Sequence, residues 1–96
     1  MKINIYSIKD EKVSFTSLTT NRSDGAARRD FAIDINNPQM RALNYSPSDF
    51  ALYRIGTFDI DTGIIEPCSP LELICTGKEV INETEWYKVS CYRSER

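Results

Sequence analysis

The sequence contains no histidine, and its three cysteines, Cys68, Cys75 and Cys91, form no C-x-x-C pair. The missing histidine excludes a histidine general base and a histidine metal ligand. An odd number of separated cysteines argues against a disulfide framework and against a zinc site. We therefore expect reduced thiols, no enzymatic activity, and no metal or other cofactor.

Long apolar runs are also missing, because Lys2, Asn4 and Lys9 interrupt the apolar residues at the N-terminus. No uncharged stretch approaches the length that a bilayer requires, and nothing resembles a signal peptide. We expect a protein of the cytosol that does not bind membranes. The length of 96 residues predicts one domain with a modest core, residues 1–96.

Basic residues are in slight deficit, since the formal net charge is −2. Nucleic-acid binders usually present a basic surface, so this total opposes such a function. The charge is uneven, however. Residues 1–54 hold eight basic and six acidic residues, a balance of +2, whereas residues 55–96 hold four and eight, a balance of −4. Any phosphate-binding surface is therefore expected in the first half.

A helix is predicted over residues 23–35. Asn21 and Ser23 are suitable N-terminal caps, and the sequence Asn-Asn-Pro at residues 36–38 ends the helix because proline cannot continue its hydrogen bonds. Apolar residues recur at four-residue intervals and predict a stripe that faces the core, namely Ala27, Phe31 and Ile35.

The rest of the chain reads mainly as strands. Alternating residues predict a first strand from Lys2 to Ile8 and a weaker second strand that includes Phe15. The central hairpin is predicted at residues 50–66, with Gly63 at positive φ in its turn. A proline-bounded corner at residues 67–70, a strand at 71–75 and a terminal hairpin at about 78–91 follow. The predicted fold class is α+β, an antiparallel sheet of about five strands with one helix packed on a face.

Single-stranded DNA is bound by cations that hold phosphates and by flat side chains on which bases stack. The candidates are the arginines and three tyrosines, namely Arg22, Arg28, Arg29, Arg41, Arg54, Tyr6, Tyr45 and Tyr53. Tyr53 and Arg54 are adjacent on a strand and so point to opposite faces. The alternative is that the arginines form a solvated helix face paired with aspartates and that the tyrosines, like the four phenylalanines, belong to the core.

A family resemblance bears on this choice. The run D-F-A-L-Y-R-I-G-T-F-D at Asp49–Asp59, followed by Thr62-Gly63, resembles the central motif of the small nonstructural protein of gokushoviruses, tailless single-stranded DNA phages of the Microviridae. The first ten residues are similar to that family's N-terminus, and A-A-R-R-D-F at Ala26–Phe31 matches its helical block. The resemblance spans roughly the first three quarters of the chain in the family's order and spacing.

The resemblance implies a phage-encoded protein that binds single-stranded viral DNA with little sequence preference in the host bacterial cytoplasm, during genome replication or single-strand production. We expect homodimerisation, because pairing would gather a basic groove on an acidic chain. The competing hypothesis is an interaction module for a phage or host replication, assembly or capsid protein. Its surface would be the acidic second half with the aromatic residues Trp86, Tyr87 and Tyr92.

Overall fold

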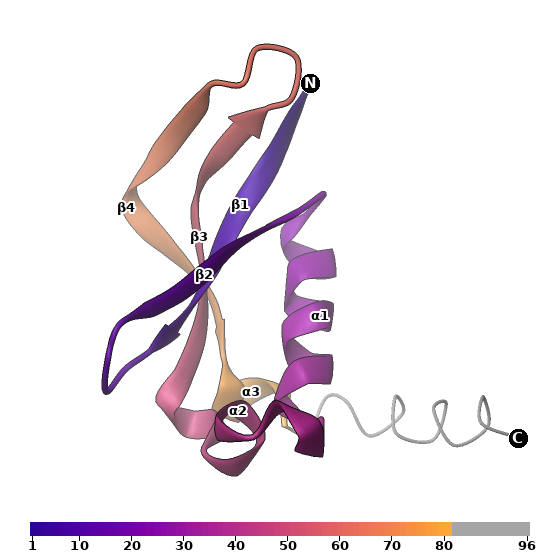
Figure 1. Cartoon of the computed structure of the whole chain (residues 1–96), viewed down its shortest axis with the longest axis vertical. Helices are drawn as coiled ribbons and strands as arrows, with labels where there is room; N and C mark the ends of the chain where they lie inside the picture. Colours follow the sequence, from indigo (N-terminus) through magenta and orange to yellow (C-terminus); the bar gives the residue numbers. More distant parts are fainter. Residues whose placement is uncertain (82–96) are drawn as a thin grey trace, which may run out of the picture.

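Four antiparallel strands form the sheet in the computed structural model, which describes residues 1–81 (Figure 1). Their order across the sheet is β2-β1-β3-β4. The strands are β1 (Lys2–Asp10), β2 (Phe15–Asn21), β3 (Phe50–Asp59) and β4 (Ile65–Thr76). The helix α1 (Asp24–Ile35) lies against one face. The predicted α+β class is confirmed.

Helix α1 begins and ends where the capping residues predict. The Ser23 side chain accepts a hydrogen bond from the backbone N–H of Ala26 at 3.1 Å, and the backbone N–H of Asn36 donates to the Ala32 carbonyl at 3.2 Å. The chain then passes through η1 (Pro38–Met40), α2 (Ala42–Tyr45) and η2 (Pro47–Asp49) before β3 begins. These short turns cover one end of the sheet (Figure 1).

The predicted central hairpin is confirmed as β3 and β4. Asp59 organises its turn, because its Oδ1 accepts from the backbone N–H of Asp61 at 2.9 Å while its carbonyl accepts from that of Gly63 at 2.7 Å. Gly63 has φ of 76°, a value that glycine adopts without a steric penalty. Asp59 therefore caps the turn backbone, while the Asp61 carboxylate pairs with the N-terminal ammonium group of Met1.

The structure corrects two predictions in the second half of the chain. β4 is one continuous strand from Ile65 to Thr76, so the predicted corner at residues 67–70 does not divide it. For this reason residues 1–81 contain four strands rather than five. The start of the predicted terminal hairpin is helical instead, forming α3 (Gly77–Val80), and its remainder at residues 82–91 lies outside the described residues, as do Trp86, Tyr87 and Tyr92.

Local chemistry explains why α3 forms. Thr76 and Glu79 make a reciprocal capping box, in which each side chain accepts from the other's backbone N–H. Gly77 packs against η2, where a Cβ would collide with the Pro47 carbonyl oxygen. This close approach brings Val80 into the core.

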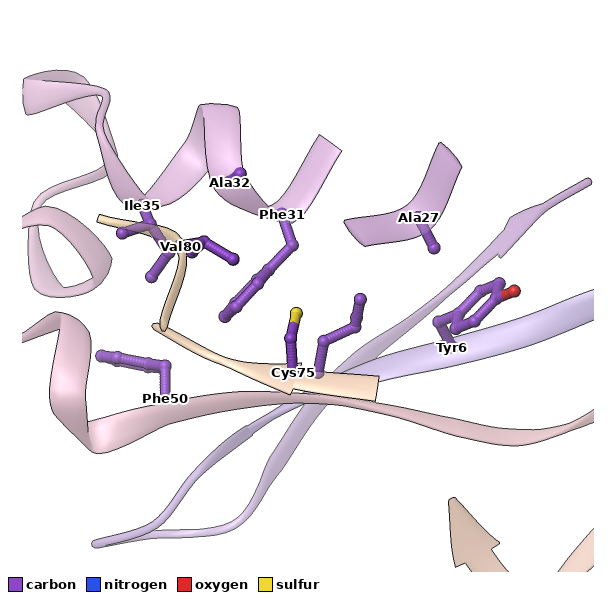
Figure 2. Close-up of a cluster of buried hydrophobic side chains, with 9 residues drawn as sticks. Tyr6, Ala27, Phe31, Ala32, Ile35, Phe50, Cys75 and Val80 are labelled. Atoms are coloured by element: carbon purple, nitrogen blue, oxygen red, sulfur yellow. The ribbon is translucent and has the colours of Figure 1, made fainter. Parts of the chain in front are cut away.

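The core fills the space between α1 and the sheet (Figure 2). The predicted stripe of Ala27, Phe31 and Ile35 is buried, and Ala32 joins it. From the sheet and α3 come Tyr6, Phe50, Leu52, Cys75 and Val80. Both described cysteines are free, as expected, with Cys75 buried and Cys68 partly exposed. Within residues 1–81, no helix has the length and apolar character needed to cross a membrane.

Replacing Phe31 by alanine is expected to lower the free energy of unfolding by about 3–5 kcal/mol, because it leaves a cavity in the centre of this core. Equilibrium urea unfolding measures the loss. The matched control is Ile33→Ala on the same helix, where the side chain is exposed and the expected loss is below about 1 kcal/mol. Equal losses in the two variants would contradict the placement of the core.

Candidate nucleic-acid interface

A hydrogen-bonded cluster fastens the start of α1 to the sheet. Asp24, the first residue of the helix, accepts from the Tyr6 hydroxyl at 2.6 Å and from Arg54 Nη1 at 3.1 and 3.0 Å through its two oxygens. Arg54 also pairs with Glu72 on β4, and Asn4 Nδ2 donates to the Tyr6 hydroxyl at 3.0 Å. Tyr6 and Arg54 face each other across β1 and β3.

This cluster corrects the expectation that Tyr6 stacks on bases and makes phosphate binding by Arg54 less favourable. The Tyr6 side chain is 0% exposed, so its ring is closed to a nucleic-acid base and it is not a stacking residue. The Arg54 guanidinium contacts the carboxylates of Asp24 and Glu72, and phosphate binding would have to displace them. Both side chains hold the fold together.

The other predicted arginines surround α1 and do not meet in one cleft. Arg22 comes two residues before the helix, and Arg41 comes six residues after its last residue. A helix of 12 residues is about 18 Å long, so these two residues lie at opposite ends of it. Arg28 and Arg29 are on the helix itself, the former partly buried and the latter exposed.

Arg41 and Tyr45 are brought together at one corner of the molecule. Arg41 precedes α2 and Tyr45 is its last residue, and the backbone N–H of Tyr45 donates to the Arg41 carbonyl at 2.7 Å. Tyr45 is 89% exposed. Both residues line a shallow hollow of about 480 Å³ together with Pro38, Ala42 and Asn44. A cation and an open aromatic ring are thus adjacent here.

A second aromatic group lies on the sheet face opposite α1. Tyr53 lies between Leu52 and Arg54, which both point toward the helix, so its ring points the other way. Phe15 packs edge-to-face on it, with ring centroids 5.6 Å apart and planes at 73°. The Lys9 ammonium lies 5.5 Å from the Phe15 centroid. We call Lys9, Phe15 and Tyr53 the open-face patch.

The prediction that Tyr53 and Arg54 point to opposite faces of the sheet is therefore confirmed. Phe15 was expected in the core, and the structure corrects this, because its side chain is 40% exposed. The signal was present in the sequence of β2, F-T-S-L-T-T-N, where polar residues occupy both parities and neither face reads as buried. Lys9 comes to lie opposite Phe15 through an irregular register between β1 and β2, which the sequence alone does not reveal.

The turn between β1 and β2, which separates Lys9 from Phe15, and α2, which follows Arg41 and ends at Tyr45, lie at the same end of the sheet (Figure 1). The turn after β1 contacts η2 there, through a hydrogen bond of 2.8 Å from the Glu11 backbone N–H to the Asp49 carbonyl. Lys9 pairs with Glu11 at 3.7 Å and Lys12 with Asp49 at 3.5 Å. Exposed ion pairs of this kind are worth about 0–1 kcal/mol, so a phosphate group competes with them easily.

Residues 3–80 match the family model described as Phage ORF5 protein. Of the described residues 1–81, the match leaves out 1, 2 and 81, so it covers α1 and the whole sheet except the first residue of β1. Comparison with curated proteins and with solved structures gave no match.

The Tyr6 hydroxyl generates a testable pH dependence. Burial, reinforced by the hydrogen bond to Asp24, raises the pKa of Tyr6 to about 12 from an ordinary value of 10.0. Between these values the unfolded chain releases the proton while the folded chain retains it, so the stability gained from the neutral hydroxyl is lost as the pH rises from 10 to 12. Urea unfolding at successive pH values measures the free energy.

Tyr6→Phe is the informative variant, because it lacks the group that titrates. It should be less stable than the parent at neutral pH, by about 1–3 kcal/mol, and its stability should fall less steeply above pH 10. Tyr53→Phe is the matched control and should behave as the parent does. If the steepness is the same in Tyr6→Phe and the parent, Tyr6 is not the source of the alkaline instability.

Proposed function

Since the chain belongs to the Phage ORF5 protein family, we propose that this phage protein binds single-stranded viral DNA, with little sequence preference, during genome replication or single-strand production. The resemblance to the gokushovirus nonstructural protein supports the choice of ligand by analogy. The host bacterial cytoplasm, where such a genome is copied, is the compartment that this function requires.

The observation that carries the proposal is the open-face patch. Two aromatic rings and an ammonium group occupy one face of an antiparallel sheet, and α1 covers the other face. Aromatic rings on an open sheet face are a common platform for unpaired bases, and each stacked base contributes about 1–3 kcal/mol. Stacking of this kind requires bases that are free of a duplex.

Phosphate contacts are supplied at the same end of the molecule. Lys9 belongs to the patch, Lys12 lies on the turn after β1, and Arg41 lies at the start of α2, in the segment that leads to the η2 turn that Lys12 contacts. Tyr45 next to Arg41 offers a further ring for a base farther along the strand. A single strand that crosses the patch and this corner would therefore meet cations and rings at intervals.

The composition of the patch explains why we propose little sequence preference. Every base has a π-face, so rings that stack on bases do not discriminate strongly among them. Sequence reading requires polar side chains placed against base edges, and the three members of the patch are a lysine, a phenylalanine and a tyrosine.

The net charge of −2 limits the electrostatic part of this binding. About three phosphate contacts would give a slope of roughly −2 for the logarithm of affinity against the logarithm of salt concentration, because each contact with a single strand contributes about −0.7. The proposed binding is thus moderate in salt dependence and relies on stacking.

Lys9→Ala should weaken binding to all single-stranded sequences alike and reduce the salt slope by about 0.7, the share of one phosphate contact. Fluorescence anisotropy with a labelled oligothymidine and a labelled mixed-sequence strand, over a range of salt, gives both quantities. Lys2→Ala is the matched control, because Lys2 stands on the same strand, outside the patch and paired with Glu66. An unchanged slope in Lys9→Ala would contradict the contact.

Phe15→Leu should weaken binding by about 5–100-fold, since it keeps an apolar side chain but removes the ring, and a stacked base contributes about 1–3 kcal/mol. Leu18→Ala is the control on the same strand. It shortens a side chain that is 62% exposed and carries no ring, so binding should be unchanged. Thermal unfolding of each variant verifies that the fold is retained.

The predicted helix arginines provide the decisive comparison. Should Arg28→Ala/Arg29→Ala abolish binding while Phe15→Leu binds as the parent does, the DNA site belongs to α1 and the assignment to the open-face patch is wrong. Binding of duplex DNA as tightly as single strands would also exclude stacking on this patch, because paired bases do not present their faces.

A further inference from the structure

An open groove of about 770 Å³ lies between β2 and α1, on the helix side of the sheet. Its floor is apolar, formed by side chains of the core that are not fully covered, namely Ile8, Phe31, Phe50 and Leu52. One wall is β2, with Thr16, Ser17 and Thr19. This volume is within the range of about 300–1,000 Å³ that is typical of binding pockets.

β2, which forms one wall of the groove, is an edge strand that lacks the features that block pairing with a further strand. From Phe15 to Asn21 it carries no charge and no proline, and its residues 15–20 are exposed. The opposite outer strand, β4, differs, because it contains Pro67 and Pro70 and two glutamates. Charges and prolines are the usual devices that prevent a further strand from pairing with an edge. Only β4 has them.

The charged side chains of residues 1–81 that line the groove are all acidic. Asp10, Asp30 and Asp34 line it, and no lysine or arginine of the described chain does. Asp30 accepts from Asn21 Nδ2 at 2.9 Å, which bridges the two walls. Neither Asp30 nor Asp34 has an ion pair with any residue from 1 to 81. Burial and the nearby Asp30 charge raise the pKa of Asp34, so a cation in the groove would relieve both effects.

We propose that this groove binds an extended cationic peptide segment of a partner protein, which pairs with β2 as a fifth strand. Residues of an added strand point alternately to the two faces. Lysine or arginine at the positions facing the groove would lay their aliphatic stems on the apolar floor and bring their charged groups to the aspartates. The intervening residues would lie beside Leu18 on the open face.

The partner's chemistry follows from the groove. A second copy of this chain would bring the same strand, β2, which carries no cations, and DNA would be repelled by the carboxylates. The peptide is therefore cationic and alternates with uncharged residues. About seven residues match the length of β2, some 23 Å at the usual rise per residue.

The probe is a labelled seven-residue peptide, acetyl-Lys-Val-Lys-Val-Lys-Val-Lys-amide, and fluorescence anisotropy measures its binding to the full chain. A second probe replaces the three valines by prolines, which keeps the charge but removes the backbone N–H groups that strand pairing needs. We expect the valine probe to bind at least about tenfold more tightly than the proline probe, since main-chain hydrogen bonds supply much of the affinity in this mode.

Asp30→Asn/Asp34→Asn tests the groove itself. The neutral amides are nearly the same shape, and we expect about tenfold weaker binding of the valine probe, corresponding to two lost charge contacts. The matched control is Asp61→Asn/Glu66→Gln, which removes the same charge at the β3–β4 turn and should change binding less than about twofold. Single-stranded DNA binding should not weaken in either variant.

Several results would overturn the proposal. These are equal binding of the two probes, equal loss in the two charge variants, and no binding of the valine probe to the parent chain at about 100 μM. Light scattering, which measures the molar mass, tests whether a second copy of this chain occupies the groove instead. A parent chain that is dimeric and becomes monomeric in Asp30→Asn/Asp34→Asn would show that a second copy fills the groove.

Discussion

The Asp24 carboxylate, at the first turn of α1, accepts hydrogen bonds from Tyr6 on β1 and Arg54 on β3. An acid at a helix N-terminus is favourable by itself, because the free N–H groups there carry partial positive charge. In this chain the same acid also joins the helix to two neighbouring strands. The orientation of α1 on the sheet depends on this contact, and so does the division of the sheet into a covered and an open face.

That division separates two kinds of surface. On the open face, Phe15 is exposed, Tyr53 beneath it is partly exposed, and Lys9 adds a cation. On the covered face, α1 leaves β2 uncovered along part of its length, which creates the acidic groove. In a protein with a net charge of −2, the open face thus holds Lys9 beside the two rings, while Asp10, Asp30 and Asp34 line the groove on the covered face.

The arginines show why a count of basic residues does not locate a phosphate-binding surface. Eight basic residues precede Ile55, yet Arg54 contacts two carboxylates and Arg22 and Arg41 stand at opposite ends of α1. Affinity for a polyanion depends on cations that face one path, because screening weakens charges more than about 8–10 Å away in physiological salt. The groups that share a surface with exposed rings are Lys9 and Arg41, and only the second was a candidate from the sequence.

The sequence by itself determined the local elements. The caps and Pro38 set the bounds of α1, its four-residue apolar spacing identified Phe31 and Ile35 as core, and Asp59 with Gly63 specified the central turn. Each of these depends on residues a few positions apart. The alternation rule also placed Tyr53 and Arg54 on opposite faces, since successive strand residues always diverge.

Only the tertiary structure decided which face of the sheet the helix covers. That choice buried Tyr6 and left Phe15 exposed with its strand partner Lys9 beside it. It also decided that β4 runs through residues 67–70 and that α3, whose helical turn the local capping box favours, packs its Val80 into the core. These outcomes depend on contacts between segments distant in sequence, such as Asp24 with Arg54 and Gly77 with Pro47, whose energies no local pattern encodes.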